Sequence, residues 1–124
     1  MNKRAPNDPS EAMILKSILD WLTVNGIFHF RCNTGAGMMS NAKGAARFVR
    51  FGAKGCPDIV GIFSTGSILD KWHCHVDGIF FGIEVKTRKG VQSPDQKAFQ
   101  LAMEKAGGLY ILARSLKDLK DRLG

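Results

Sequence analysis

The stretch from residue 55 to residue 86 decides the fold, because it holds two apolar runs that carry charged residues. Residues 55–63 read GCPDIVGIF, and residues 79–86 read IFFGIEVK. Short apolar runs bounded by turn residues are typical of buried strands. Side chains alternate across a strand, so Glu84 and Lys86 are predicted to share one face. Charges on such a strand are costly unless a cation or a phosphate offsets their desolvation.

The chain is predicted to form one domain with a mixed β-sheet. Its 124 residues suit a single hydrophobic core, preceded by a loose tail at residues 1–7. Four segments have the apolar pattern of strands: 27–32, 59–63, 79–87 and 109–113. A helix between the last two predicts that they are parallel, joined by a right-handed crossover. The expected fold class is α/β, with the sheet flanked by helices.

Capping signals predict the helices. The first is expected to begin with Asp8 as its N-cap and to end at Asn25. The second follows Ser93, which forms a capping box with Gln96. Its expected buried stripe consists of Phe99, Ala102, Met103 and Ala106. A short helix over 115–123 closes the chain.

The charge distribution favours a polyanionic partner, and nucleic acid is the first candidate. The formal net charge is +7. No Asp or Glu occurs from Trp21 to Pro57. The same interval holds the basic residues Arg31, Lys43, Arg47, Arg50 and Lys54. We interpret the glycine-rich segment 33–57 as a loop facing nucleic acid, with a short helical turn near 43–48.

Composition excludes several other classes of protein. With 44% hydrophobic and 23% charged residues, the chain is not wholly disordered. It has no apolar run long enough for a membrane span and no signal-peptide core, so we expect a cytoplasmic protein. Three irregularly spaced cysteines predict reduced thiols. The tripeptide His73-Cys74-His75 leaves a zinc site open against a plain loop, since no second ligand pair completes it.

Asp58 and Glu84 are the candidate metal ligands. On neighbouring strands their carboxylates would converge at one end of the sheet. Hard oxygen ligands favour Mg²⁺ or Mn²⁺, and the backbone carbonyl of Val85 is a further candidate ligand. Lys86 would hold or deprotonate an attacking water, or neutralise charge on a phosphoryl group. The alternative is an exposed Glu84–Lys86 pair on an edge strand, with Asp58 as a turn residue.

The same residues resemble a known family of nucleases. Pro57-Asp58 followed by Glu84-Val85-Lys86 looks like the PD-(D/E)xK nuclease motif. Together with SPDQ at 93–96 and AGG at 106–108, it resembles the virus-type replication–repair nuclease (VRR-NUC) domain over roughly residues 11–119. The resemblance implies a restriction-endonuclease-like fold and Mg²⁺- or Mn²⁺-dependent cleavage of DNA. Stand-alone members are homodimers that act on branched DNA such as four-way (Holliday-type) junctions.

The resemblance also implies roles for individual residues. Asp58 and Glu84 would bind the metal, and Lys86 would be the catalytic lysine. Glu11 would reach the metal region through water, or would instead belong to the capping box at the start of the first helix. Gln96 would face the site in addition to capping its own helix.

The predicted function is therefore a Mg²⁺-dependent, structure-selective DNA endonuclease. By the same resemblance, Arg31 and Asn33 would lie near DNA phosphate. The alternatives are a flap-type or RNA nuclease on the same fold, or a non-catalytic nucleic-acid-binding protein. A phage origin, within a bacterial host, is implied by the resemblance alone.

Overall fold

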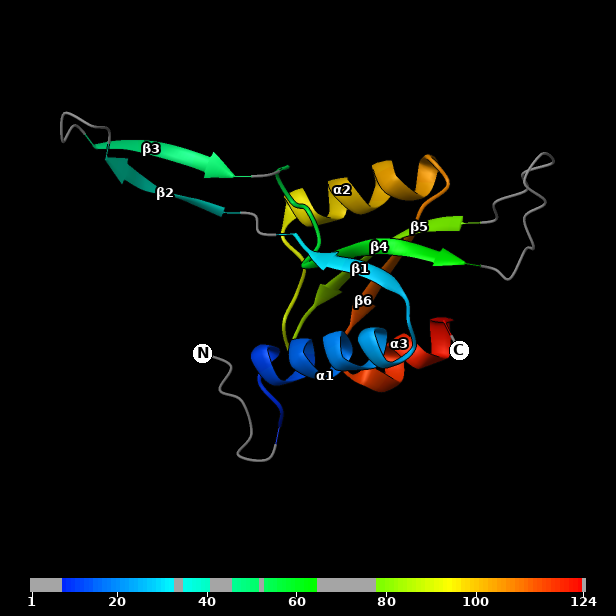
Figure 1. Cartoon of the computed structure of the whole chain (residues 1–124). Coiled ribbons are helices and arrows are strands. Elements are labelled where there is room, and N and C mark those ends of the chain that lie inside the picture. The colour runs from blue at the N-terminus through cyan, green and yellow to red at the C-terminus, as the bar shows by residue number, and fades with distance from the viewer. Residues whose placement is uncertain (1–7, 33–34, 41–45, 52, 65–77, 124) are drawn as a thin grey trace.

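A four-stranded mixed sheet separates one helix from two others (Figure 1). The computed structural model describes residues 8–32, 35–40, 46–51, 53–64 and 78–123. The elements are α1 (Glu11–Val24), β1 (Phe28–Arg31), β2 (Gly35–Ser40), β3 (Ala46–Phe51), β4 (Ile59–Ser64), β5 (Gly78–Val85), α2 (Pro94–Lys105), β6 (Leu109–Ala113) and α3 (Leu116–Leu123). The predicted α/β fold class is confirmed. None of the helices in these ranges is long and apolar enough to cross a membrane.

The two strands of the deciding stretch, β4 and β5, are central neighbours in the sheet. The strand order is β1-β4-β5-β6. β4 pairs antiparallel with β1 and with β5, whereas β5 pairs parallel with β6, as predicted. Ile59 lies opposite Ile83 in the β4–β5 register. This register brings the residue before β4 next to the end of β5.

One face of the sheet packs against α1 and α3. Apolar residues recur at helical spacing along α1, and the sheet supplies every second side chain, as the strand period requires. The buried cluster consists of Ile14, Ile18, Leu22, Ile59, Phe81, Ile83, Val85, Ile111, Ala113 and Leu119. Full burial of each large apolar side chain contributes about 1.5–3 kcal/mol. Truncation of Phe81, which is fully buried, should cost about 3–5 kcal/mol.

The other face is only partly covered, by α2 (Figure 1). Met103 is the one residue of the expected stripe that is buried. The prediction is wrong for the others: Phe99 is half-buried, and Ala102 and Ala106 are exposed. They border an open groove beside Phe80, because α2 packs against the β6 side of the sheet and leaves the β1 side uncovered.

The first helix begins later than predicted. Ser10, not Asp8, is its N-cap: the chain is extended there, and the Ser10 hydroxyl accepts the Met13 N–H at 3.2 Å. Glu11 is therefore the first helical residue, and the capping box proposed for it with Asp8 is wrong. The predicted end is confirmed, with Asn25 as the C-cap.

A β-hairpin occupies much of the segment that was predicted to be a loop. Strands β2 and β3 pair antiparallel from Gly35↔Phe51 to Ser40↔Ala46. They form a separate two-stranded sheet that extends away from the main one (Figure 1). The predicted helical turn is wrong for residues 46–48, which lie in β3. The glycines of this segment led us to expect an irregular loop. Instead, pairing between β2 and β3 satisfies the backbone polar groups along both strands.

Candidate metal and phosphate site

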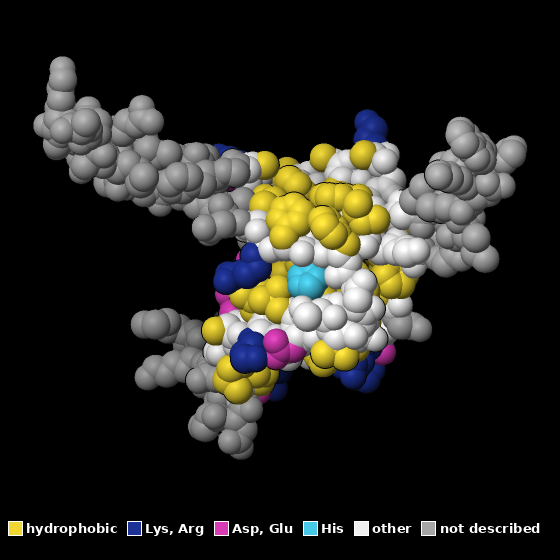
Figure 2. Space-filling model, in the orientation of Figure 1, with side chains coloured by type: hydrophobic (Ala, Val, Ile, Leu, Met, Phe, Trp, Pro, Cys, Tyr) yellow, Lys and Arg dark blue, Asp and Glu magenta, His cyan; other side chains and the backbone are white. Residues whose placement is uncertain are grey.

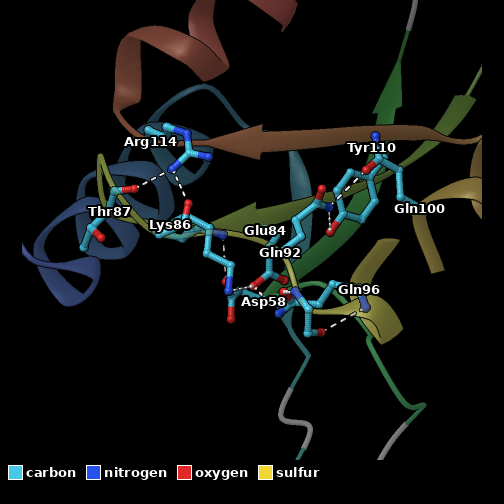
Figure 3. A network of polar contacts seen from close by, with 12 residues as sticks. Asp58, Glu84, Lys86, Thr87, Gln92, Gln96, Gln100, Tyr110 and Arg114 are labelled. Atoms are coloured by element: carbon cyan, nitrogen blue, oxygen red, sulfur yellow. Dashed lines mark hydrogen bonds and ion pairs between the residues drawn. The ribbon is translucent and has the colours of Figure 1, made fainter. Parts of the chain in front are cut away.

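Asp58 and Glu84 meet at one end of the central strands (Figure 3). Asp58 precedes β4, and Glu84 is the next-to-last residue of β5. Continuing the Ile59↔Ile83 register by one residue places them opposite each other. The Oδ2 atom of Asp58 accepts the Val85 N–H at 2.7 Å, which anchors the first carboxylate to the strand of the second. The predicted convergence of these two carboxylates is thus present.

Glu84 is a buried carboxylate whose two oxygen atoms have different surroundings. The residue is 4% exposed, and its Oε1 accepts a hydrogen bond from Gln96 Nε2 at 2.9 Å. The ammonium of Lys86 lies 3.7 Å from the same oxygen, with the lysine side chain 16% exposed. Oε2 is buried and has no hydrogen-bond partner among the described residues. An exposed pair on an edge strand is therefore wrong, because β5 is a central strand and both side chains are shielded.

The surroundings of Glu84 favour its neutral form in the absence of a cation. Burial raises its pKa to about 7, from an ordinary value of 4.5. The negative charge of Asp58 adds to this rise, Lys86 opposes it, and Glu11 adds a smaller contribution. A ligand that restores the ionised form of Glu84 must therefore place positive charge beside its carboxylate.

Gln96 joins the start of α2 to the buried carboxylate. Its backbone N–H donates to the Ser93 hydroxyl at 3.1 Å, and its side-chain oxygen accepts the Ser93 N–H at 2.9 Å. The amide nitrogen that remains is the donor to Glu84. The capping role and the site-facing role predicted for Gln96 therefore coexist in one side chain.

A glycine lets the segment before Asp58 lie against α2. Gly55 has φ +79°, and a Cβ there would lie 2.2 Å from the carbonyl oxygen of Asp95. Only glycine tolerates both conditions without displacement of the backbone. Next to it, Lys54 forms an exposed ion pair with Asp95 at 3.5 Å. The loop that delivers Asp58 is thus fixed to the first turn of α2.

Only some of the other predicted site residues lie in the described part of the chain. Arg31 is exposed and pairs with Ile59 at the end of β1, one residue from Asp58 in the register. Glu11 is exposed in the first turn of α1. Arg47 and Arg50 belong to β3. Asn33, Lys43 and the tripeptide His73-Cys74-His75 lie outside the described residues.

Arg114 is a contributor that sequence reasoning missed. It follows β6, and its Nη1 donates to the carbonyl oxygens of Thr87, Arg88 and Gly90 at 2.7, 3.3 and 2.6 Å. These contacts hold the turn that follows Lys86 (Figure 3). No motif marks a single arginine after a strand, so the sequence carried no signal for this contact.

A glutamine–tyrosine cluster beside Glu84 was missed as well. Gln92 Nε2 donates to Gln100 Oε1 at 3.0 Å and to the Tyr110 hydroxyl at 3.2 Å. Burial raises the pKa of Tyr110 to about 12, which the hydrogen bond from Gln92 opposes and the charges of Glu84 and Asp58 reinforce. The hydroxyl is therefore protonated at neutral pH.

Two cysteines lie close to the carboxylates. The Sγ atoms of Cys32 and Cys56 are 2.6 Å apart, and both residues are half-buried. Burial raises the pKa of Cys56 to about 12, with further rises from its hydrogen bond to Cys32 and from the negative charges nearby. Cys56 is thus a protonated thiol at neutral pH.

The donor set fits a hard divalent cation. Two carboxylates face each other, and a buried Glu84 oxygen has no hydrogen-bond partner in the ranges that the structure describes. Mg²⁺ keeps several waters and requires only one or two protein carboxylates. Within the described residues there is no cluster of three His, Cys, Asp or Glu side chains that could hold a metal, so a cage of protein ligands is not formed there. A hollow of about 590 Å³ lies elsewhere, beside Trp21 and Ile27.

Comparison of the chain with protein-family models, curated proteins and solved structures finds no match. The VRR-NUC resemblance therefore rests on the motifs Pro57-Asp58, Glu84-Val85-Lys86, residues 93–96 and residues 106–108. It stays a prediction.

Proposed function

We propose that this protein is a Mg²⁺- or Mn²⁺-dependent endonuclease that hydrolyses phosphodiester bonds in branched DNA. The observation that carries the proposal is the buried Oε2 of Glu84, which has no hydrogen-bond partner within the described part of the chain. Glu84 lies opposite Asp58 in the strand register, and its other oxygen lies 3.7 Å from the Lys86 ammonium. A buried polar atom without a partner costs about 1–3 kcal/mol and is uncommon in a purely structural core. A cofactor that binds this oxygen would remove the penalty.

Asp58 and Glu84 would hold the cation, with the Val85 carbonyl as a candidate third ligand. A bound divalent cation supplies a Lewis acid for a phosphoryl oxygen and lowers the pKa of a coordinated water. The protein orients both carboxylates in advance: Val85 N–H holds Asp58, and Gln96 holds Glu84. Preorganised ligands avoid the cost of rearrangement during the reaction.

Lys86 is the candidate catalytic lysine. Its ammonium lies 3.7 Å from Glu84 Oε1, and a largely shielded ammonium interacts strongly with an anionic phosphoryl group. It would hold or deprotonate the attacking water, or neutralise charge in the transition state. Glu11, whose charge influences Glu84, would act through water.

The basic residues around the site suit a phosphate backbone. Arg31 is exposed at the end of β1, one residue from Asp58 in the register, and the sequence of β3 contains Arg47 and Arg50. Lysine and arginine contacts to phosphate release counterions, so affinity should fall steeply with salt. No element for reading bases is evident in the described residues, and we propose recognition of DNA shape rather than sequence. A DNA substrate is consistent with a cytoplasmic location.

We also propose that two copies associate. Phe28 lies opposite Ile62, and Ile62 lies opposite Phe80, in one row across the sheet. The three residues are 64%, 49% and 48% exposed. Figure 2 shows the hydrophobic patch between α2 and β1. An uncharged patch suits a second copy of a basic chain, whereas DNA requires cations. A two-fold axis would present two sites to a symmetric junction.

The test is cleavage of a labelled four-way junction, with a flap, a plain duplex and an RNA of matched sequence in parallel. We expect Mg²⁺-dependent junction cleavage that Lys86→Ala lowers at least about 100-fold while binding persists. Lys89→Ala is the matched control, because Lys89 is exposed and has the same charge. Preferential cutting of the flap or the RNA would favour those substrate classes. Binding without cleavage by the wild type would favour a non-catalytic protein.

A further inference from the structure

Two thiols face each other at the base of the β2–β3 hairpin. The Sγ atoms of Cys32 and Cys56 lie 2.6 Å apart. A disulfide requires a separation of about 2.05 Å, so an approach of roughly half an ångström would bring these atoms to bonding distance. Both residues are half-buried, which leaves a route for a small oxidant. Because the thiolate is the reactive form, the raised pKa of Cys56 makes this oxidation slow at neutral pH and faster as pH rises.

The backbone holds both thiols in place. The Cys32 N–H donates to the carbonyl of Asp58 at 2.9 Å, which continues the pairing of β1 with β4 beyond Arg31. The Cys56 N–H donates to the carbonyl of Ala53 at 3.1 Å, and the adjacent Pro57 is fully buried. The contact therefore belongs to the framework of the sheet rather than to two unanchored loops.

The two cysteines flank the β2–β3 hairpin in the sequence. Cys32 follows β1 and Cys56 precedes β4, and both strands of the β2–β3 hairpin lie between them in sequence. A bond between the two sulfur atoms would tie the ends of the hairpin together. It would also restrict the unfolded chain, because it closes a loop between residues 24 positions apart.

We propose that Cys32 and Cys56 are an oxidation site, at which hydrogen peroxide joins the two thiols in a reversible disulfide. Two S–H bonds break and one S–S bond forms. Two protons and two electrons pass to hydrogen peroxide, which leaves as two molecules of water. Dithiothreitol reverses the reaction and is itself oxidised to its cyclic disulfide. The proposal does not depend on nuclease activity.

Peptide mapping of the full chain tests the pairing directly. The protein is treated with hydrogen peroxide, blocked with N-ethylmaleimide and digested with trypsin without reductant. Cys32, Cys56 and Cys74 fall into separate tryptic peptides, residues 32–43, 55–71 and 72–86. We expect a species that joins 32–43 to 55–71, lighter by two hydrogen atoms than their sum and lost on reduction. A link to 72–86 instead, or complete alkylation of both Cys32 and Cys56, overturns the proposal.

Thermal unfolding supplies a second readout. The oxidised wild type should unfold at least about 5 °C above the reduced protein. Cys32→Ser and Cys56→Ser should each lose this difference, and the matched control Cys74→Ser should keep it. An equal peroxide-dependent rise in Cys32→Ser would contradict the proposal. Should either serine variant fail to fold, the peptide map of Cys74→Ser decides, because only the two proposed partners remain in it.

Discussion

The side-chain amide of Gln96 donates to Oε1 of Glu84 at 2.9 Å while its oxygen caps the helix that carries it. The start of α2 and the orientation of the buried carboxylate are therefore coupled through one residue. A change at Gln96 alters both the stability of the helix and the charge balance of the site, and the two effects can be separated.

Gln96→Glu should separate them. Glutamate can complete the capping box with Ser93, but it places a second carboxylate against Glu84. We expect near-normal helix capping at low pH, a loss of stability above neutral pH, and cleavage at least about tenfold slower. Ser93→Ala is the control: it should cost about 1 kcal/mol through the cap while the Glu84 contact remains. Equal pH dependence of unfolding in the two variants would contradict the coupling.

The raised pKa of Glu84 predicts how stability depends on pH. In the window from pH 4.5 to about 7, the folded chain keeps a proton on Glu84 that the unfolded chain has released. The folded state binds more protons, so the free energy of unfolding falls as pH rises, by on the order of 3 kcal/mol at most. Urea denaturation in EDTA at pH 5 and pH 8 measures the difference.

Mg²⁺ should oppose this loss, because it stabilises the carboxylate that burial disfavours. The expected result is a larger Mg²⁺-dependent rise in stability at pH 8 than at pH 5. Glu84→Gln should flatten the pH dependence, abolish the Mg²⁺ effect and leave the EDTA-treated protein more stable at pH 8. A wild-type slope that survives in Glu84→Gln would assign the titration to another group.

The carboxylate pair could be predicted because its geometry follows from local rules. Alternation along β5, continued to the residue after it, places Glu84 and Lys86 together, and antiparallel pairing brings Asp58 opposite Glu84. The Ser93–Gln96 capping box also depends on residues three apart. By contrast, Arg114 reaches Thr87 across 27 positions, and the contact between Cys32 and Cys56 depends on how a hairpin returns to the sheet. Such contacts have no periodicity that a sequence reveals.

Arg114 should support Lys86 through the turn between them. Arg114→Met leaves the carbonyls of Thr87, Arg88 and Gly90 without their donor, which should cost about 1–3 kcal/mol and lower cleavage as well. Arg122→Met, at an exposed position in α3, is the charge-matched control and should change neither measurement. Thermal unfolding and junction cleavage, measured on the same preparations, check both effects.

Arg31 and Lys54 should contribute unequally to binding DNA. Arg31 is exposed at the end of β1, one residue from Asp58 in the register, whereas Lys54 already pairs with Asp95 at 3.5 Å. We expect Arg31→Gln to weaken binding more than Lys54→Gln and to reduce the slope of log K against log salt by about one. Asp95→Asn should strengthen binding, since it frees the lysine. Titrations at several salt concentrations, in EDTA to prevent cleavage, give these slopes.

The apolar row across β1, β4 and β5 should mediate self-association. Ile62 lies between Phe28 and Phe80 in the strand register, and all three side chains are exposed to solvent. A lysine at the centre of the row would meet its own copy across a two-fold axis, so Ile62→Lys should shift a dimer to monomer in sedimentation velocity. Because Ile62 is 49% exposed, the fold should survive, which circular dichroism checks.

Leu101→Lys is the matched control for this surface. Leu101 is 71% exposed on α2 and does not belong to the row, so its substitution should leave the dimer intact. If the wild type sediments as a monomer at tens of micromolar, the row does not mediate self-association, and paired cutting of a junction would need another explanation. If both lysine variants dissociate equally, the effect comes from added positive charge on a chain whose net charge is already +7. Only selective loss in Ile62→Lys supports contact through the row itself.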